Sequence, residues 1–185
     1  MEKMKELLVA ESIGVNRYFY LAFSLFVLMS VSVEKAFAQS IFNVVAYGAK
    51  CDGTTSDDTA FNAAIIAAGN TTCDGSVQTH IDLPMGKTCK LSLPLTINAA
   101  CVGIKGNGAS LNFSALQSGP AITVDWVNNT QVGVGQPGTW ENFHLVGAGP
   151  SYSTVGMLIQ APENVFRKID INNFGVGIKA DNNFT

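Results

Sequence analysis

One short amphipathic helix constrains the fold of this chain more than any other feature of its sequence. Apolar side chains recur at i, i+3, i+4 and i+7 over residues 61–68, which predicts a helix with one apolar stripe. Ser56 or Asp57 can cap its start through a side-chain oxygen, and Asp58 places negative charge in the first turn. Gly69 predicts a left-handed stop. Because the stripe is mostly alanine, we expect the helix to pack closely against a flat surface.

A set of short motifs leads from an apolar strand pattern into this helix. The motifs are Asn43-Val44, Tyr47-Gly48-Ala49, Asp52-Gly53 and Asp57-Asp58-Thr59-Ala60. The set resembles the N-terminal signature of the pectate-lyase-like superfamily, which includes pectate lyases, rhamnogalacturonases, hydrolases similar to glycoside hydrolase family 28, and tailspike proteins. The resemblance implies an all-β fold, a right-handed single-stranded parallel β-helix (solenoid) with an N-terminal capping α-helix.

Short strand patterns bounded by Gly, Asn, Ser or Pro fill the rest of the chain. Two of them recur, in residues 140–159 and again in 165–178, which is typical of a solenoid. A β-sandwich is the alternative, and the helix argues against it. No terminal cap is visible after residue 178, so we expect a β-helix that is incomplete at its C-terminus. Either a longer chain or another polypeptide covers that end, or the uncapped coil self-associates.

The first 38 residues have the pattern of a secretory signal peptide. Arg17 precedes an apolar run over residues 18–33, and Ala36-Phe37-Ala38 provides a small-residue cleavage site before Gln39. We therefore predict a signal peptide at 1–38, the N-terminal part of a pectate-lyase-like domain at 39–185, and a secreted or cell-surface location. An uncleaved membrane anchor is the alternative, although the apolar run is shorter than the ~20 residues of a spanning helix.

Four cysteines follow the signal segment: Cys51, Cys73, Cys89 and Cys101. An even number in an exported protein predicts two disulfides, for which three connectivities exist. We favour local pairing, Cys51 with Cys73 and Cys89 with Cys101, because each bond would join neighbouring segments. A zinc site is the alternative, but no two cysteines have the close spacing of such sites.

The charge of the chain argues against a nucleic-acid partner. The formal net charge is −3, only 14% of residues are charged, and no basic stripe occurs. The resemblance implies instead that the partner is a polysaccharide, with the membrane contacted only through the signal segment.

Catalytic residues are hard to identify from the sequence. Hydrolases of the resembling family use several Asp residues with Gly-His-Gly and Arg-x-Lys segments, and the strand region here has no such set. The Asp57-Asp58 pair lies at the helix start, where capping explains it. Lyases of that family bind Ca²⁺ through clustered carboxylates and use Arg as base. The weak catalytic candidates are Asp170, Arg167, Glu141, Asp125 and His144, and the weak Ca²⁺ candidates are Asp170, Asp181 and Glu141.

We favour the alternative that these candidates are solvated outward positions on strands, and no other cofactor is indicated. The Gly- and Asn-rich segment 128–138 predicts a loop that faces substrate or is an inert insertion. We predict an exported polysaccharide-active protein of hydrolase or lyase type, of which this chain alone lacks a catalytic set. A non-catalytic glycan binder or a structural, tailspike-like surface protein is the alternative.

Overall fold

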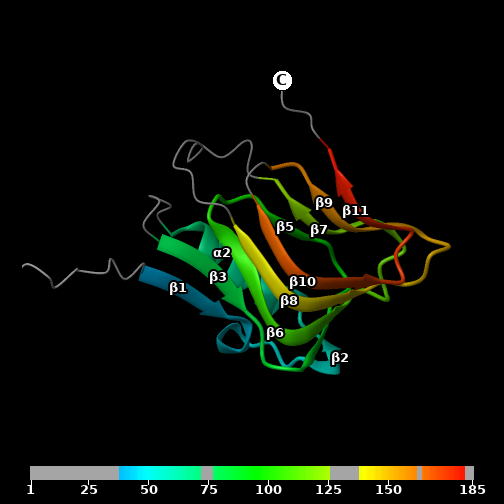
Figure 1. Ribbon diagram of the computed structural model, residues 1–185. Coiled ribbons are helices and arrows are strands. Elements are labelled where there is room, and N and C mark those ends of the chain that lie inside the picture. The colour runs from blue at the N-terminus through cyan, green and yellow to red at the C-terminus, as the bar shows by residue number, and fades with distance from the viewer. Residues whose placement is uncertain (1–37, 72–76, 126–137, 162–163, 182–185) are drawn as a thin grey trace, which may run out of the picture. The chain divides into compact units, whose positions relative to one another are not determined.

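The computed structural model describes residues 38–71, 77–125, 138–161 and 164–181 (Figure 1). Three predicted features lie outside these ranges: the part of the signal segment that precedes Ala38, the residue Cys73, and the 128–138 loop except for its last residue.

The larger of two sheets has seven strands, and its pairings are parallel. They are β1 (Ala38–Asn43), β2 (Asp52–Ser56), β3 (Val77–Asp82), β4 (Thr88–Lys90), β6 (Val102–Asn112), β8 (Thr139–Val146) and β10 (Val165–Asn172). Five follow the order β1-β3-β6-β4-β2, while β8 pairs with β6 and β10 pairs with β8.

The smaller sheet has four parallel strands in the order β11-β9-β7-β5, which lie side by side in Figure 1. They are β5 (Leu95–Ile97), β7 (Ser118–Val124), β9 (Ser153–Ile159) and β11 (Val176–Ala180). From β5 onward, successive strands alternate between the smaller and the larger sheet.

The predicted fold class, a right-handed single-stranded parallel β-helix solenoid with a capping α-helix, is wrong. The structure has two parallel sheets of seven and four strands and, in the described ranges, one α-helix. Each repeat of a solenoid contributes equivalent strands, whereas β1 to β4 all join the larger sheet before the first strand of the smaller sheet occurs. In addition, β6 pairs with three strands, β3, β4 and β8. The expectation of a strand-rich chain with parallel pairing agrees with the structure.

One apolar core cluster joins the helix and both sheets. Phe61 of the helix, Ile122 of β7 and Phe143 of β8 are fully buried and belong to it. Because alternate residues of a strand face opposite sides, the core side chains of β6 and β8 leave their neighbours in sequence on the outer face of the larger sheet.

The helix α2 (Asp58–Gly69) begins and ends close to the predicted positions. Its predicted apolar stripe is confirmed, because Phe61, Ala64, Ile65 and Ala68 are all buried. It packs against β1, β3, β5 and the 3-10 helix η1 (Val44–Tyr47). The predicted left-handed stop is wrong, since Gly69 lies inside the helix and Asn70, the capping residue, is right-handed.

Strand β6 contains a segment with the composition of a turn. Residues 105–108 have the composition of a turn, but they lie inside this 11-residue strand. Asn107 has a φ of 53°, and the pairing register with β8 shifts between Lys105 and Ala109. A left-handed residue with a register shift bends a strand without reversing it. The Gly- and Asn-rich sequence therefore makes a bend rather than a turn between strands.

A disulfide joins Cys51 to Cys89, which lie 38 residues apart. The predicted local pairing of Cys51 with Cys73 is therefore wrong, and so is that of Cys89 with Cys101. The reason is that parallel β2 and β4 lie side by side, which brings the residue before β2 next to the middle of β4. Cys101 is also disulfide-bonded.

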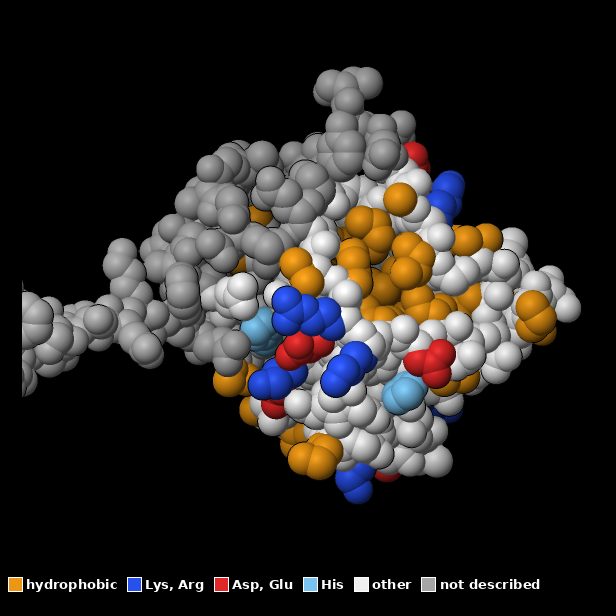
Figure 2. Space-filling view, viewed as in Figure 1, with side chains coloured by type: hydrophobic (Ala, Val, Ile, Leu, Met, Phe, Trp, Pro, Cys, Tyr) orange, Lys and Arg blue, Asp and Glu red, His pale blue; other side chains and the backbone are white. Residues whose placement is uncertain are grey.

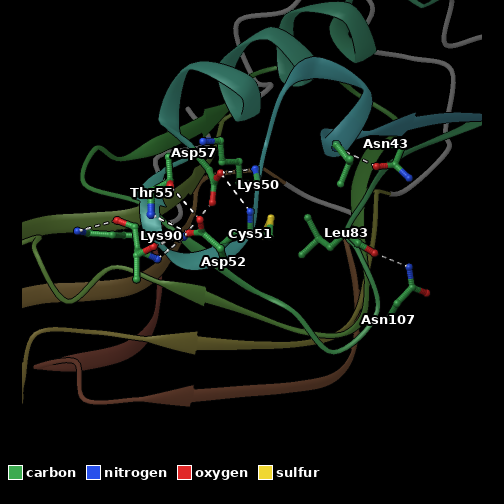
Figure 3. The surroundings of a disulfide bond; sticks show 12 residues. Asn43, Lys50, Cys51, Asp52, Thr55, Asp57, Leu83, Lys90 and Asn107 are labelled. Atoms are coloured by element: carbon green, nitrogen blue, oxygen red, sulfur yellow. Dashed lines mark hydrogen bonds between the residues drawn. A yellow bond between two sulfur atoms is a disulfide. The ribbon is translucent and has the colours of Figure 1, made fainter.

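The start of α2 lies beside this disulfide and is held by a buried carboxylate. Asp57 does not cap its own helix with its side chain. Instead its carboxylate accepts hydrogen bonds from the backbone N–H groups of Lys50, Cys51 and Lys90. Figure 3 shows the carboxylate pointing toward these backbone atoms. Asp58 likewise accepts hydrogen bonds from the backbone N–H groups of residues 92 and 93. The Asp57-Asp58 pair, which was predicted to cap the helix, thus binds segments outside the helix.

The burial of Phe61 generates a stability prediction. We expect Phe61→Ala to lower the free energy of unfolding by about 3 to 5 kcal/mol, because it removes a fully buried ring and leaves a cavity. Urea denaturation followed by circular dichroism measures the change. Ile66→Ala on the same helix is the control, since Ile66 is 63% exposed. Equal destabilisation by the two substitutions would contradict the core position of Phe61.

Candidate functional site

The outer face of the larger sheet carries rows of polar side chains in register across four strands. On β6, Ala109 and Leu111 are buried, so the partly exposed Ser110 between them faces outward. On β8, His144 likewise lies between buried Phe143 and Leu145. We define the polar row by its four members in register, Thr88 of β4, Ser110 of β6, His144 of β8 and Asp170 of β10.

Within the polar row, His144 and Asp170 are in contact. The distance from Nδ1 of His144 to Oδ2 of Asp170 is 3.3 Å, and these side chains are 47% and 56% exposed. A carboxylate at one ring nitrogen orients the imidazole and favours a proton on that nitrogen. Nε2 is then the nitrogen that faces a ligand or a neighbouring side chain.

A second row lies two residues further along the same strands. Its members in register are Lys90, Asn112, Val146 and Asn172. Oδ1 of Asn112 accepts a hydrogen bond from the N–H of Ser114 at 2.9 Å, which directs its amide N–H groups away from that turn. This row adds ammonium and amide groups to the hydroxyl, imidazole and carboxylate groups of the polar row.

A charged row crosses the other half of the sheet. Asp82, Lys105, Glu141 and Arg167 are in register on β3, β6, β8 and β10, so the sign alternates from strand to strand. Opposite charges directly across neighbouring strands stabilise a sheet modestly. Figure 2 shows acidic, basic and histidine side chains close to one another on the face that contains these strands.

Left-handed residues separate the charged row from the polar row. Asn107, Asn142 and Lys168 have φ values of 53°, 58° and 52° at matching places on β6, β8 and β10. Asn107 also donates hydrogen bonds to the Asp82 carboxylate and the Leu83 carbonyl, both at 2.8 Å. This bend sets the two halves of the outer face apart.

His80 on β3 is a buried histidine that the sequence did not indicate. It is 4% exposed, and neither ring nitrogen has a hydrogen-bond partner among the residues that the structure describes. Burial is the main cause that lowers the pKa of His80 below its ordinary value of 6.5, and the positive charge of Lys105 lowers it further. The carboxylates of Glu141 and Asp82 raise this pKa but do not cancel the effect of burial. The imidazole is therefore held neutral inside the fold.

The structure brings together only some of the predicted site residues. His144 contacts Asp170, and Arg167 lies in register with Glu141. Glu141 and Asp170 belong to different rows, so these two candidate carboxylates are not in register with each other. Asp125 and Asp181 follow strands of the smaller sheet, where their N–H groups bind Ile97 and Ile159 carbonyls.

The three carboxylates predicted to bind Ca²⁺ do not form a cluster in the described residues. The group there that has the geometry of a metal site is Cys51, Asp57 and Cys89. Both cysteines are bonded to each other and Asp57 binds backbone N–H groups, so this group is structural. The same disulfide excludes the zinc alternative for Cys51 and Cys89 in the oxidised protein.

Trp140 and Tyr152 are aromatic side chains of the kind that stacks on sugar rings, and they differ in their exposure to solvent. Trp140 is fully buried, donates through Nε1 to Asn164 and stacks on Phe166 at 6.0 Å between ring centroids. Tyr152 is exposed in the segment before β9.

Sequence reasoning missed Ser110 as a partner of His144. The two residues are 34 positions apart, and only the parallel register of β6 with β8 makes them neighbours. The alternation of buried and exposed residues around Ser110 was a signal for its outward direction, but no signal in one sequence gives the register between two strands.

Comparison with known proteins gives a fold likeness and no family. Neither the protein-family models nor the curated proteins match this sequence. A solved structure that is similar is the ORF18 protein of Geobacillus virus E2, with 20% sequence identity and a TM-score of 0.51. The likeness covers 71% of this chain and 25% of the viral chain, so this chain spans about a quarter of that protein's length. At this identity the likeness concerns the fold alone.

The described residues include no helix with the length and apolar character required to span a membrane.

The burial of His80 generates a prediction about pH. Below about pH 6.5 this histidine binds a proton in the unfolded chain more readily than in the folded protein, where its pKa is lower. The free energy of unfolding therefore decreases as the pH is lowered below this value. The slope from this group is at most about 1.4 kcal/mol per pH unit. Urea denaturation at about pH 7.5 and about pH 5.5 should show a smaller pH dependence in His80→Gln than in the parent. His144→Gln, at an exposed position, is the control, and an unchanged pH dependence in His80→Gln would contradict the prediction.

Proposed function

We propose that this chain belongs to an exported protein that acts on a polysaccharide, and that the glycan binds on the outer face of the larger sheet. The binding surface consists of the polar row and the second row defined above. The observation that carries the proposal is the contact between His144 and Asp170 within a row of hydrogen-bonding side chains in register.

The chemistry of the two rows supports a carbohydrate ligand. Sugar hydroxyls both donate and accept hydrogen bonds, and the rows offer carboxylate and hydroxyl acceptors beside amide, hydroxyl and ammonium donors. Because the side chains stand on neighbouring parallel strands, they repeat at the strand spacing of about 4.8 Å. An open surface of this kind suits an extended polymer better than a small enclosed ligand. The resemblance of the N-terminal motifs to polysaccharide-active proteins points to the same ligand class.

Binding, rather than cleavage of the glycan backbone, is what the acidic residues support. Most glycosidases use two carboxyl groups that flank one bond. Here Asp170 pairs with a histidine, and Glu141 lies between two basic residues in the charged row. Asp170 therefore binds the glycan, and these acidic residues are not paired for the cleavage of a glycosidic bond.

The cysteine bonding supports export. A disulfide between Cys51 and Cys89 is typical of proteins that fold in an oxidising compartment. Together with the predicted signal segment, it favours a secreted or cell-surface protein.

The glycan proposal predicts loss of binding on substitution in the polar row. We expect the full chain to bind an acidic polysaccharide such as polygalacturonate or a neutral one such as xylan, measured by affinity electrophoresis. His144→Ala and Asp170→Ala should each raise the dissociation constant about five- to tenfold, because each removes hydrogen bonds that contribute about 1 kcal/mol. Ca²⁺, which a lyase-like protein would need, is added or chelated in parallel.

Lys179→Ala is the control, since this residue is exposed on β11 of the smaller sheet. A parent chain that binds none of a broad panel of polysaccharides would overturn the proposal. Equal binding by the parent and both polar-row variants would overturn the assignment of the surface.

The export proposal predicts a processed N-terminus. On expression with secretion, we expect mass spectrometry of the product to give a chain that begins at or near Gln39, because cleavage follows Ala38. Replacing Ala36 and Ala38 by bulky residues should block processing, while Ala46→Val, away from the site, should not. A product that retains residue 1 in the membrane fraction would contradict the prediction.

A further inference from the structure

We propose that Ser110, His144 and Asp170 form a nucleophile, base and carboxylate relay that hydrolyses ester groups carried by the glycan. That the ester belongs to a polysaccharide rests on the proposed function. The relay itself rests on the order of the three residues across β6, β8 and β10.

The register places each residue of the relay beside the next. Ser110 is opposite His144, and His144 is opposite Asp170. All three face outward, because their neighbours in sequence on each strand belong to the core cluster or pack against it. Neighbouring strands are about 4.8 Å apart, so a hydroxyl on one strand and an imidazole on the next come within hydrogen-bond distance through side-chain rotation. Such contacts are commonly longer before substrate binds.

The contact of His144 with Asp170 gives the imidazole its direction. With Nδ1 at 3.3 Å from the carboxylate, the proton of the neutral ring resides on Nδ1 and the lone pair on Nε2. Nε2 is then the atom that accepts a proton from the Ser110 hydroxyl. Asp170 is a positioning residue in this arrangement, since it acts through His144 and does not touch the ester.

The reaction follows from these roles. Oγ of Ser110 attacks the ester carbonyl carbon, an Oγ–C bond forms, and the hydroxyl proton moves to Nε2 of His144. The tetrahedral intermediate expels the sugar hydroxyl, which takes that proton as the C–O bond breaks. Water then attacks the acyl-serine with Nε2 again as base, which releases the carboxylic acid and restores Ser110. The only co-reactant is water, and no oxidant or reductant is required.

Side chains of the second row can stabilise the negative charge that develops on the carbonyl oxygen. Backbone N–H groups of a central strand are used within the sheet, so this face must supply donors from side chains. Asn112 lies two residues after Ser110 on the same face, with its Oδ1 already bound to the N–H of Ser114. Its amide N–H groups are donors on this face, and Lys90 of β4 is in register with it, although the Lys90 ammonium also donates to the Thr54 carbonyl at 3.2 Å.

The open position of the relay indicates its substrate class. His144 and Asp170 are about half exposed, so an acyl group on a polymer that lies across the sheet reaches Ser110 without entering a pocket. The short O-acyl ester of a polysaccharide, such as an O-acetyl group, fits this geometry. A solvent-exposed relay also implies a slower reaction than an enclosed one, because water screens the interactions that stabilise the transition state.

The test combines covalent labelling with hydrolysis by the full chain. A fluorophosphonate probe should label Ser110, as mapped by mass spectrometry, and the chain should release acetate from acetylated xylan and p-nitrophenol from p-nitrophenyl acetate. Ser110→Ala and His144→Ala should each lower hydrolysis at least about 100-fold, the scale of general base catalysis. Ser118→Ala, at an exposed serine on β7 of the smaller sheet, is the matched control and should retain both labelling and activity.

Two substitutions of Asp170 distinguish a positioning role of this residue from a merely structural one. Asp170→Asn should reduce labelling of Ser110 at least about tenfold with unchanged circular dichroism, and Asp170→Glu should restore part of it. Labelling that does not occur at Ser110, or hydrolysis that persists in Ser110→Ala, would overturn the relay. Glycan binding by a chain without esterase activity would leave the proposed function standing, whereas ester hydrolysis without glycan binding would leave the relay and overturn the proposed ligand.

Discussion

The buried carboxylate of Asp57 connects three segments that are distant in the sequence. It accepts hydrogen bonds from the residues before β2 and from β4 while its own backbone starts α2, and the Cys51–Cys89 disulfide lies beside it. A buried carboxylate is tolerated only when it is well hydrogen-bonded, so each of these N–H groups must stay in place. Because β4 pairs with β6, the same interaction fixes the end of the sheet on which the polar row begins.

From that fixed end, parallel pairing carries the arrangement across the sheet. Strands β6, β8 and β10 repeat the same alternation around the polar row, so the apolar neighbours of Ser110, His144 and Asp170 lie in the core or pack against it while these three side chains face outward. The matching left-handed residues on these three strands bend the sheet at one level. The bend keeps the charged row and the polar row as distinct surfaces, which is why Glu141 faces Arg167 and His144 faces Asp170.

The N-terminal motifs predicted a helix correctly and a solenoid incorrectly. The helix is a local structure, and its apolar spacing and bounds are sufficient to specify it. The architecture depends on which strand joins which sheet, and four consecutive strands join the larger one. The cysteines show the same division, since their number indicated disulfides while the observed partner of Cys51 depends on the pairing of β2 with β4.

The amino-acid sequence alone was sufficient to predict the helix, the strand-rich character, the apolar stripe and the outward direction of residues such as His144. These features follow from interactions within a few residues, which periodicity records directly. The contact of His144 with Asp170, its position opposite Ser110, and the burial of His80 without a hydrogen-bond partner in the described ranges all depend on tertiary packing. The physical reason is that the register between parallel strands arises from packing across the whole sheet, and a shift of one residue would reverse every side chain.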